Sequence, residues 1–316
     1  MQLPTPIAQI SRGFAMGAAD IVPGVSGGTV ALVLGIYDRL IANISTGARG
    51  LKQLFTGQID EFRKTLTDIE WVWLVSLLVG ILAAIAALAS VIERLLHDEP
   101  VRMASFFLGL IIGSVWVAVR LIDRPDAATA IVMLGVGTAM FLLLGLRTDT
   151  EVADDALEVV TKSSWTFFLA GAIAICAMIL PGISGSFILV MLGMYTEVLG
   201  AVTDRDFIPL IAFMVGAVVG LALFSTLLRW LLERYHRWVM AVMVGLMLGS
   251  TRVLWAWPNG THTTTLAAPS GEVAFPLLLT AFGLVLVVGV DRLGRHFAST
   301  SPGTDARVAQ PANSHE

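Results

Sequence analysis

The chain has 316 residues, of which 56% are hydrophobic and 14% are charged. Soluble domains carry about 25% charged residues, so the composition excludes an ordinary soluble protein. The net charge of −4 gives no indication of nucleic-acid binding, and the single Cys176 excludes a disulfide framework or a cysteine metal site.

In chain order, residues 1–17 lack the charged, apolar and small-residue regions of a signal peptide. The stretch ADIVPGVSGGTVALVLGIYDRL, residues 19–40, then interrupts an apolar segment with helix-breaking residues. Apolar runs long enough to cross a membrane follow at 72–92, 103–119, 127–146 and 275–290. The sequence therefore predicts an all-α polytopic membrane protein.

The chain contains an internal repeat. ILPGISGSFILVMLGMYTEVL at 179–199 matches IVPGVSGGTVALVLGIYDRLI at 21–41 with an offset of 158. A second block matches with an offset of 136, so that GLMLGS at 245–250 falls on GLIIGS at 109–114. We predict two repeat halves, 1–146 and 163–292, an acidic linker over 147–162 and a disordered tail over 293–316.

The two offsets differ by 22 residues, which places an insert in the first half within 46–70. Apolar residues recur there at helical spacing with charges between them. This pattern predicts an amphipathic helix that lies on the membrane surface or packs on the other helices.

The basic residues predict the orientation of the chain. If each motif segment enters and leaves on the same side, one side receives 14 of the 20 basic residues and the other receives six. If each segment is one broken span, the sides carry 11 and nine. Because cytoplasmic loops carry the excess of Lys and Arg, the first arrangement is favoured, with both termini cytoplasmic.

Length indicates how far each motif segment reaches. Ser26 to Asp38 and Ser184 to Glu197 are each about a dozen residues, or roughly 18–20 Å of helix, against about 30 Å of hydrocarbon. We therefore expect re-entrant, broken-helix hairpins, each followed by three transmembrane helices. Three spans are an odd number of crossings, so the halves form an inverted structural repeat. Hairpins made of two full spans would keep the same sidedness, and this alternative stays open.

The interruptions predict a binding site, because non-helical backbone at membrane depth is tolerated only where it is buried in protein or lines a wet cavity. A helix that begins after such a break presents free N–H groups that attract anions such as phosphate. We expect the hairpin turns at Pro23, Gly24, Pro181 and Gly182. The expected phosphate-binding residues are Ser26, Gly27, Gly28, Thr29, Ser184, Gly185 and Ser186. The alternative is a kink whose small residues serve close helix packing.

Two charged residues are further candidates for coupling or for shaping the site. Asp20 precedes the first motif in an apolar segment, where it is either a proton or cation site or a cap for N–H groups of the turn. Arg252 follows GLMLGS and either contacts an anion or only extends to the membrane surface. Tyr37 and Tyr195 are expected to mark the membrane interface.

Nothing in the sequence indicates an enzyme. None of the five histidines has metal-ligand spacing with another His, Cys or carboxylate, and there is no Gly-Lys-Ser/Thr motif for ATP hydrolysis. We expect no catalytic residues, no metal and no cofactor.

The segments GAADIVPGVSGGTVALVLGIYDRLI, ILPGISGSFILVMLGMY and GLMLGSTRVLW resemble the PopT-type family of polyprenyl-phosphate transporters. The resemblance runs from Arg12 to about Arg292. It implies transport of undecaprenyl phosphate, or a related polyprenyl phosphate, across the bacterial cytoplasmic membrane for recycling in cell-envelope synthesis. Cys176 stands where we expect Ser in relatives.

Three functions stay open at this point. The leading hypothesis is a lipid-phosphate translocase that works by alternating access, with coupling to protons or sodium ions undecided. The alternative is a transporter or channel for a small soluble anion, because helix ends recognise anions in general. The third is a lipid-binding membrane protein that does not transport.

Overall fold

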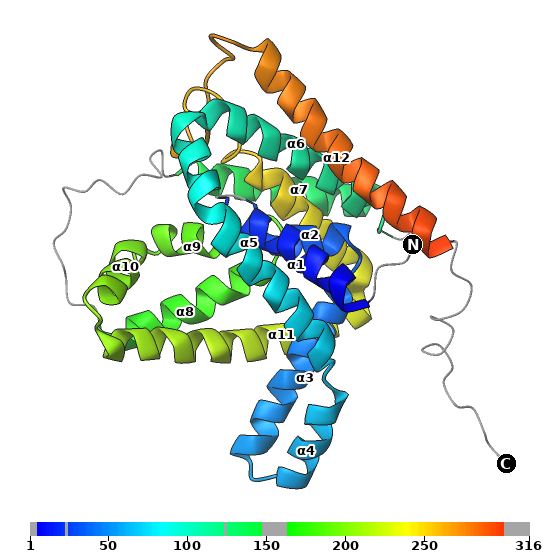
Figure 1. Ribbon diagram of the computed structural model, residues 1–316, viewed down its shortest axis with the longest axis vertical. Coiled ribbons are helices and arrows are strands. Elements are labelled where there is room, and N and C mark those ends of the chain that lie inside the picture. Colours follow the sequence, from blue (N-terminus) through cyan, green and yellow to red (C-terminus); the bar gives the residue numbers. More distant parts are fainter. Residues whose placement is uncertain (1–4, 23–24, 123–124, 147–162, 300–316) are drawn as a thin grey trace.

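The computed structural model describes residues 5–22, 25–122, 125–146 and 163–299, and this part of the chain is helical, without a strand (Figure 1). Pro23, Gly24, the linker at 147–162 and the tail from residue 300 lie outside the described residues. The helices of the first half are α1 (Thr5–Asp20), α2 (Gly27–Val33), α3 (Tyr37–Phe55), α4 (Ile59–Asp68), α5 (Trp71–Asp98), α6 (Pro100–Val119) and α7 (Ala127–Leu144). Those that follow are α8 (Ser164–Ile179), α9 (Gly185–Met191), α10 (Tyr195–Thr203), α11 (Phe207–Ser250), the short 3₁₀ helix η2 (Gly260–His262) and α12 (Ala274–Ser299).

Five of these helices, α5, α6, α7, α11 and α12, are long and apolar enough to cross a membrane. Helix α11 has 44 residues, or about 66 Å, which is about twice the hydrocarbon thickness. Its backbone leaves helical geometry at Tyr235, so it consists of an arm before this residue and an arm after it. The chain is a polytopic helical membrane protein, as the composition predicts.

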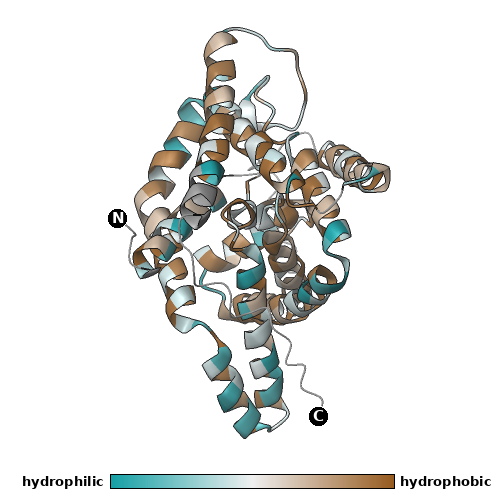
Figure 2. Cartoon of the chain, turned by 90° about the vertical axis from the view of Figure 1, so that its right-hand side faces the viewer, coloured by the Kyte–Doolittle hydropathy of each residue, from teal (hydrophilic) through white to brown (hydrophobic). Residues whose placement is uncertain are grey.

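The outer faces of these helices are apolar, and Figure 2 shows hydrophobic residues over most of them. Ile131, Leu223 and Val285 have between 63% and 70% of their surface exposed. A soluble protein has extended apolar surface of this kind only at interaction sites, whereas lipid accepts it. The surface therefore suits a bilayer.

Helix packing reveals the repeat more fully than the sequence does. Helix α1 packs along α5, and α8 packs along the first arm of α11. A Cβ atom added to Gly13 would lie 2.0 Å from the carbonyl oxygen of Leu77, and one added to Gly171 would lie 2.1 Å from that of Phe213. These residues correspond at the offsets of 158 and 136, so the same close helix pair is built twice and only glycine fits at its contact.

The third membrane-spanning helices of the two halves, α7 and α12, also correspond, although they share no sequence motif. A Cβ on Gly109 of α6 would lie 2.0 Å from the carbonyl oxygen of Thr280 in α12, and a Cβ on Gly245 of α11 would lie 2.7 Å from that of Met133 in α7. Thr280 and Met133 therefore occupy equivalent places. Each half packs its second span against the third span of the other half, so the halves interlock.

The hairpin arms are shorter than expected. The segments Ser26–Asp38 and Ser184–Glu197 do not form one helix each, because α2 and α9 have only seven residues. Gly35 and Gly193 follow them at φ +66° and +61°, the left-handed conformation that ends helices. After the second break, α9 and α10 differ in direction by 109°.

The insert at 46–70 also differs from its prediction as a single amphipathic helix. It contains the end of α3 and the whole of α4, which are joined at Gly57 with φ +75°. The two helices form an antiparallel pair that projects from the body in Figure 1. At the other end of the chain, α12 continues to Ser299, past residue 293 where the tail is expected to begin.

Gly171→Ala is expected to destabilise the protein, because its Cβ would overlap the backbone of α11. Overpacking of this kind costs about 1–3 kcal/mol, so the midpoint of thermal unfolding in detergent should fall by several degrees. The matched control is Gly135→Ala in α7, where nothing lies within 4 Å of the added atom. Equal stability of the two variants would contradict the close α8–α11 contact.

Candidate functional site

The first hairpin begins its second helix with its N–H groups already occupied. Ser26 is the N-cap of α2, and its Oγ accepts the Gly28 N–H at 3.1 Å. Oδ1 of Asp20, at the end of α1, accepts the Gly27 N–H at 2.6 Å. Of the two interpretations of Asp20, the structure therefore contains the N–H cap.

This hairpin lies directly against the second one, so the two duplicated motifs meet. The Ser26 hydroxyl lies 3.3 Å from the carbonyl oxygen of Met178 and 3.5 Å from that of Leu180, where α8 ends. Oγ1 of Thr29 accepts the Gly182 N–H at 3.0 Å. The hydroxyls of the first motif thus satisfy backbone groups that the break in the second half leaves open.

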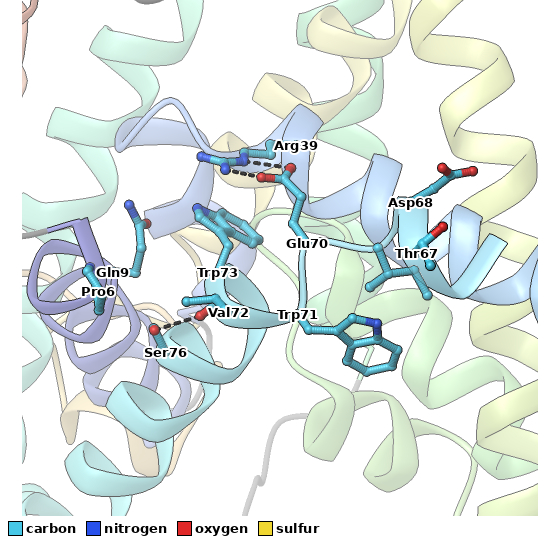
Figure 3. Close-up of a pocket in the computed structure, with 11 residues that line it drawn as sticks. Pro6, Gln9, Arg39, Thr67, Asp68, Glu70, Trp71, Val72, Trp73 and Ser76 are labelled. Atoms are coloured by element: carbon cyan, nitrogen blue, oxygen red, sulfur yellow. Dashed lines mark hydrogen bonds and ion pairs between the residues drawn. The ribbon is translucent and has the colours of Figure 1, made fainter. Parts of the chain in front are cut away.

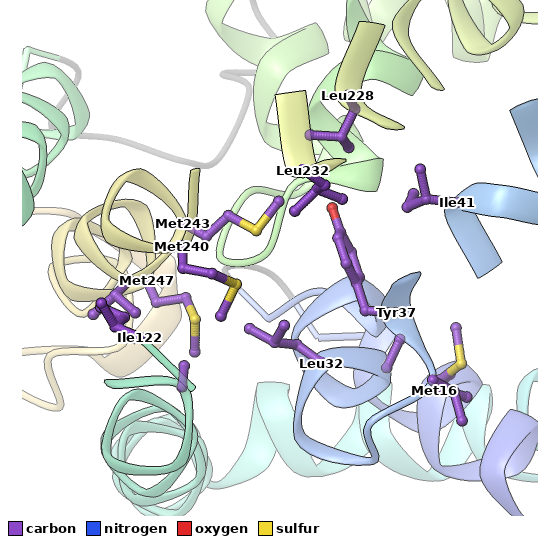
Figure 4. Close-up of a cluster of buried hydrophobic side chains, with 14 of the residues drawn as sticks. Met16, Leu32, Tyr37, Ile41, Ile122, Leu228, Leu232, Met240, Met243 and Met247 are labelled. Carbon is purple, nitrogen blue, oxygen red and sulfur yellow. The ribbon is translucent and has the colours of Figure 1, made fainter. Parts of the chain in front are cut away.

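Tyr37 completes this junction, and the prediction that it marks the membrane interface is wrong. It is 2% exposed, and its hydroxyl donates to the carbonyl oxygen of Ile179 at 3.0 Å. Figure 4 shows its side chain in the central cluster of buried side chains, pointing toward Leu232. Its counterpart Tyr195 is 37% exposed. The difference could not be read from the sequence, which has Ile-Tyr or Met-Tyr after the same Leu-Gly pair.

The start of α9 in the second hairpin is different. Ser184 makes no side-chain cap, and its Oγ lies 2.7 Å from that of exposed Ser186. Within the described residues, the N–H groups of Gly185, Ser186 and Phe187 form no hydrogen bond. In the first hairpin the hydroxyls and N–H groups predicted to bind an anion are therefore engaged. In the second hairpin the N–H groups are unpaired and the two hydroxyls bond to each other.

One sequence difference accounts for this asymmetry. Asp20 and Met178 correspond in the repeat, as do Gly27 and Gly185. A Cβ on Gly27 would lie 2.5 Å from the Asp20 carboxylate, and one on Gly185 would lie 2.5 Å from Cγ of Met178. Both side chains thus cover the same point of the hairpin, but a thioether is a weak acceptor and leaves the N–H groups open.

The turn residues of the second hairpin are buried against α11. Pro181 and Gly182 are both buried, and Gly182 has φ +85°. A Cβ on Gly182 would lie 2.7 Å from Cα of Met247. This turn therefore needs glycine both for its conformation and for the close approach to α11.

An apolar cavity of about 470 Å³ adjoins the first hairpin between α1, α2, α5, α6 and α12. Its lining is hydrophobic apart from the hydroxyl-bearing residues Thr29 and Ser114. Thr29 also belongs to the hairpin junction, so the cavity reaches the polar turn. Only a weak signal in the sequence points to this cavity, because its lining residues come from five helices.

In the described part of the chain, the Arg252 side chain forms no hydrogen bond with the hairpin residues. Its Nε donates to the carbonyl oxygen of Thr264 at 3.1 Å, and its guanidinium lies 4.9 Å from the centre of the Phe141 ring. These partners belong to α7 and to the loop after α11. In this conformation Arg252 holds that loop in place.

Paired interruptions at corresponding points of two repeated halves are typical of membrane transporters. The model of the undecaprenyl phosphate translocase-like family matches residues 16–272, and the chain belongs to this family. It is 40% identical over 246 residues to a protein of Vibrio cholerae named polyprenyl-phosphate transporter, covering 78% of this chain and 76% of that one. It is 33% identical over 250 residues to a protein of the same name from Staphylococcus aureus, covering 76% and 83%. No solved structure matches the chain significantly.

Tyr37→Phe is expected to weaken the junction of the hairpins, because it leaves the Ile179 carbonyl unsatisfied in a buried place. Such a loss costs about 1–3 kcal/mol and should lower the unfolding midpoint in detergent. Tyr195→Phe is the matched control, since the Tyr195 hydroxyl has no hydrogen bond in the described part of the chain. The assignment fails if both variants unfold at the same temperature.

Proposed function

We propose that this protein translocates a polyprenyl phosphate, with undecaprenyl phosphate as the expected substrate, across the bacterial cytoplasmic membrane. The apolar cavity that reaches the polar hairpin turn carries this proposal. A lipid phosphate needs a polar place for its head and an apolar groove for its tail, side by side. A soluble anion, the alternative substrate, would have no use for the groove. The names of the two relatives support the same conclusion.

In this proposal the phosphate binds where α2 or α9 begins. The residues are Ser26, Gly27, Gly28 and Thr29 at the start of α2, or Ser184, Gly185 and Ser186 at the start of α9. The second group has free donors in this conformation, and the first is closed by Asp20 and by the contacts with α8. In alternating access the junction between the hairpins then opens. The first hairpin gains free donors and the second hairpin loses them. Arg252 has no part in binding in this scheme.

The arrangement in the membrane follows the same reasoning. Helices α2 and α9 each span about 10 Å, too little to cross the hydrocarbon, which supports re-entrant hairpins. With α11 as two spans, each half has three, and the equivalent packing of the halves supports an inverted repeat. The charge bias supports a cytoplasmic location for both termini.

The double variant Ser26→Ala/Ser184→Ala is expected to reduce transbilayer movement of polyprenyl phosphate at least tenfold in liposomes, because both hairpins lose a hydroxyl. The matched control is Ser225→Ala, a buried serine of α11 outside the hairpins, which should transport normally. Removing the Ser26 cap costs about 1 kcal/mol, so folding of each variant is checked by its unfolding midpoint. Native transport rates in the folded double variant would remove the hydroxyls from the site.

The substrate class is tested by competition in the same liposomes. Unlabelled polyprenyl phosphate is expected to compete, and inorganic phosphate at equal concentration is not, since it lacks the tail that fills the cavity. Strong competition by inorganic phosphate would favour the soluble-anion alternative. Binding of the lipid without movement would favour a protein that does not transport.

Asp20 is the proposed coupling residue, because it is the carboxylate at the hairpin junction. Asp20→Asn keeps an oxygen that can accept the Gly27 N–H but removes the charge. If protons or sodium ions drive transport through Asp20, this variant should lose its response to imposed ion gradients while it still binds the lipid. An unchanged response to both gradients would exclude Asp20 from coupling.

A further inference from the structure

A second cavity, of about 580 Å³, lies where α1 and α3 meet the start of α5 (Figure 3). Gln9 of α1 lines it, whereas Asp20 of the hairpin is at the opposite end of the same helix, about 16 Å away along the helix axis. The cavity is therefore separate from the hairpin junction. The polar residues in its lining include Gln9, Arg39, Asp68, Glu70, Trp73 and Ser76.

Trp73 carries an unused donor at this place. It is 6% exposed, and its Nε1 is buried without a hydrogen-bond partner in the described part of the chain. Figure 3 shows this nitrogen on the edge of the ring that faces Gln9. Buried indole N–H groups usually have a partner, so an orphan beside a cavity points to a missing acceptor.

Gln9 supplies a second donor. It is also 6% exposed, and its side-chain oxygen accepts a hydrogen bond from Arg12 Nη1 at 3.3 Å. This bond fixes the amide so that its oxygen is used and its NH₂ group is not. Among the described residues, no acceptor contacts that NH₂ group.

Arg39 supplies a third donor. Its Nε and Nη2 donate to the Glu70 carboxylate, and its guanidinium stands 4.8 Å from the centre of the Trp73 ring. Neither bond to Glu70 uses Nη1. The hydrogen bonds from Arg39 hold the pKa of Glu70 below its usual range, so Glu70 stays ionised and fixes the guanidinium in place.

The acceptors nearby are already committed or point elsewhere. Glu70 is bound by Arg39 and by Asn43, and the Ser76 hydroxyl donates to the carbonyl oxygen of Val72 at 2.6 Å. In Figure 3 the Asp68 side chain points away from Trp73 and Gln9. Among the described residues, the cavity thus gathers donors from three helices, and its two carboxylates are either paired or turned away from these donors.

We propose that this cavity binds a phosphate-type oxyanion through Trp73 Nε1, the Gln9 amide and Arg39 Nη1. The oxygen-rich group is either the head group of a phospholipid or free phosphate, and the two have the same recognition chemistry. Trp71 and Trp73 stand at the beginning of a membrane-spanning helix, a depth at which lipid head groups lie. The site does not depend on the proposed transport activity.

Trp73→Phe tests the site, because it keeps the ring and removes only the N–H donor. The probes are dioctanoyl phosphatidic acid and inorganic phosphate, each titrated by calorimetry into the delipidated full chain in detergent. A lost hydrogen bond to a charged group weakens binding by about tenfold or more. Trp71→Phe is the matched control, because Trp71 lines the same cavity but its Nε1 already donates to the carbonyl oxygen of Leu66 at 2.8 Å.

Weaker binding in Trp73→Phe with unchanged binding in Trp71→Phe supports the site. If Trp73→Phe weakens the binding of phosphatidic acid alone, the ligand is a lipid head group. If it weakens the binding of both probes, the site accepts any phosphate. Unchanged binding in Trp73→Phe, or equal loss in the two tryptophan variants, overturns the proposal. In the liposome assay Trp73→Phe should still move polyprenyl phosphate at the wild-type rate, which separates this cavity from the hairpin site.

Discussion

The structure depends on how the open backbone groups at the end of α8 are satisfied. A buried carbonyl or N–H group without a partner costs free energy, so a helix break inside the protein needs other groups to complete its hydrogen bonds. Ser26, Thr29 and Tyr37 of the first half supply the missing partners at Met178, Ile179 and Gly182. The helix break in the second half is therefore stable only beside the hairpin of the first half. The hydrogen bonds that join the hairpins thus stabilise the fold and also form the candidate site.

The same interaction makes the site asymmetric. Asp20 caps α2 in the first half, whereas Met178 covers the equivalent point in the second and leaves the start of α9 open. The two repeated halves thus have one closed and one open hairpin, and the proposed alternating access rests on this asymmetry. The interlocked packing of α6 with α12 and of α7 with α11 gives both hairpins a common rigid frame.

Much of this arrangement could be predicted because repeats and apolar runs are local patterns. The two Pro-Gly-x-Ser-Gly motifs and the membrane spans of the first half were both open to sequence reasoning. The equivalence of α7 and α12 was not, because it appears only in which backbone Gly109 and Gly245 approach. The break at Gly57 was missed for a different reason: helical spacing of apolar residues continues across it.

By itself, the sequence determined that the chain crosses the membrane several times, that it contains two halves and that each half has a broken helix. Composition, hydrophobic periodicity and repeated motifs are properties of residues that are near one another in the sequence, so they can be recognised without the tertiary structure. Only the tertiary structure decided that Tyr37 is buried at the junction, that Arg252 holds a loop and that Trp73 and Gln9 face a common cavity. These outcomes depend on which distant backbone or side-chain group completes each hydrogen bond, and this is settled by helix packing.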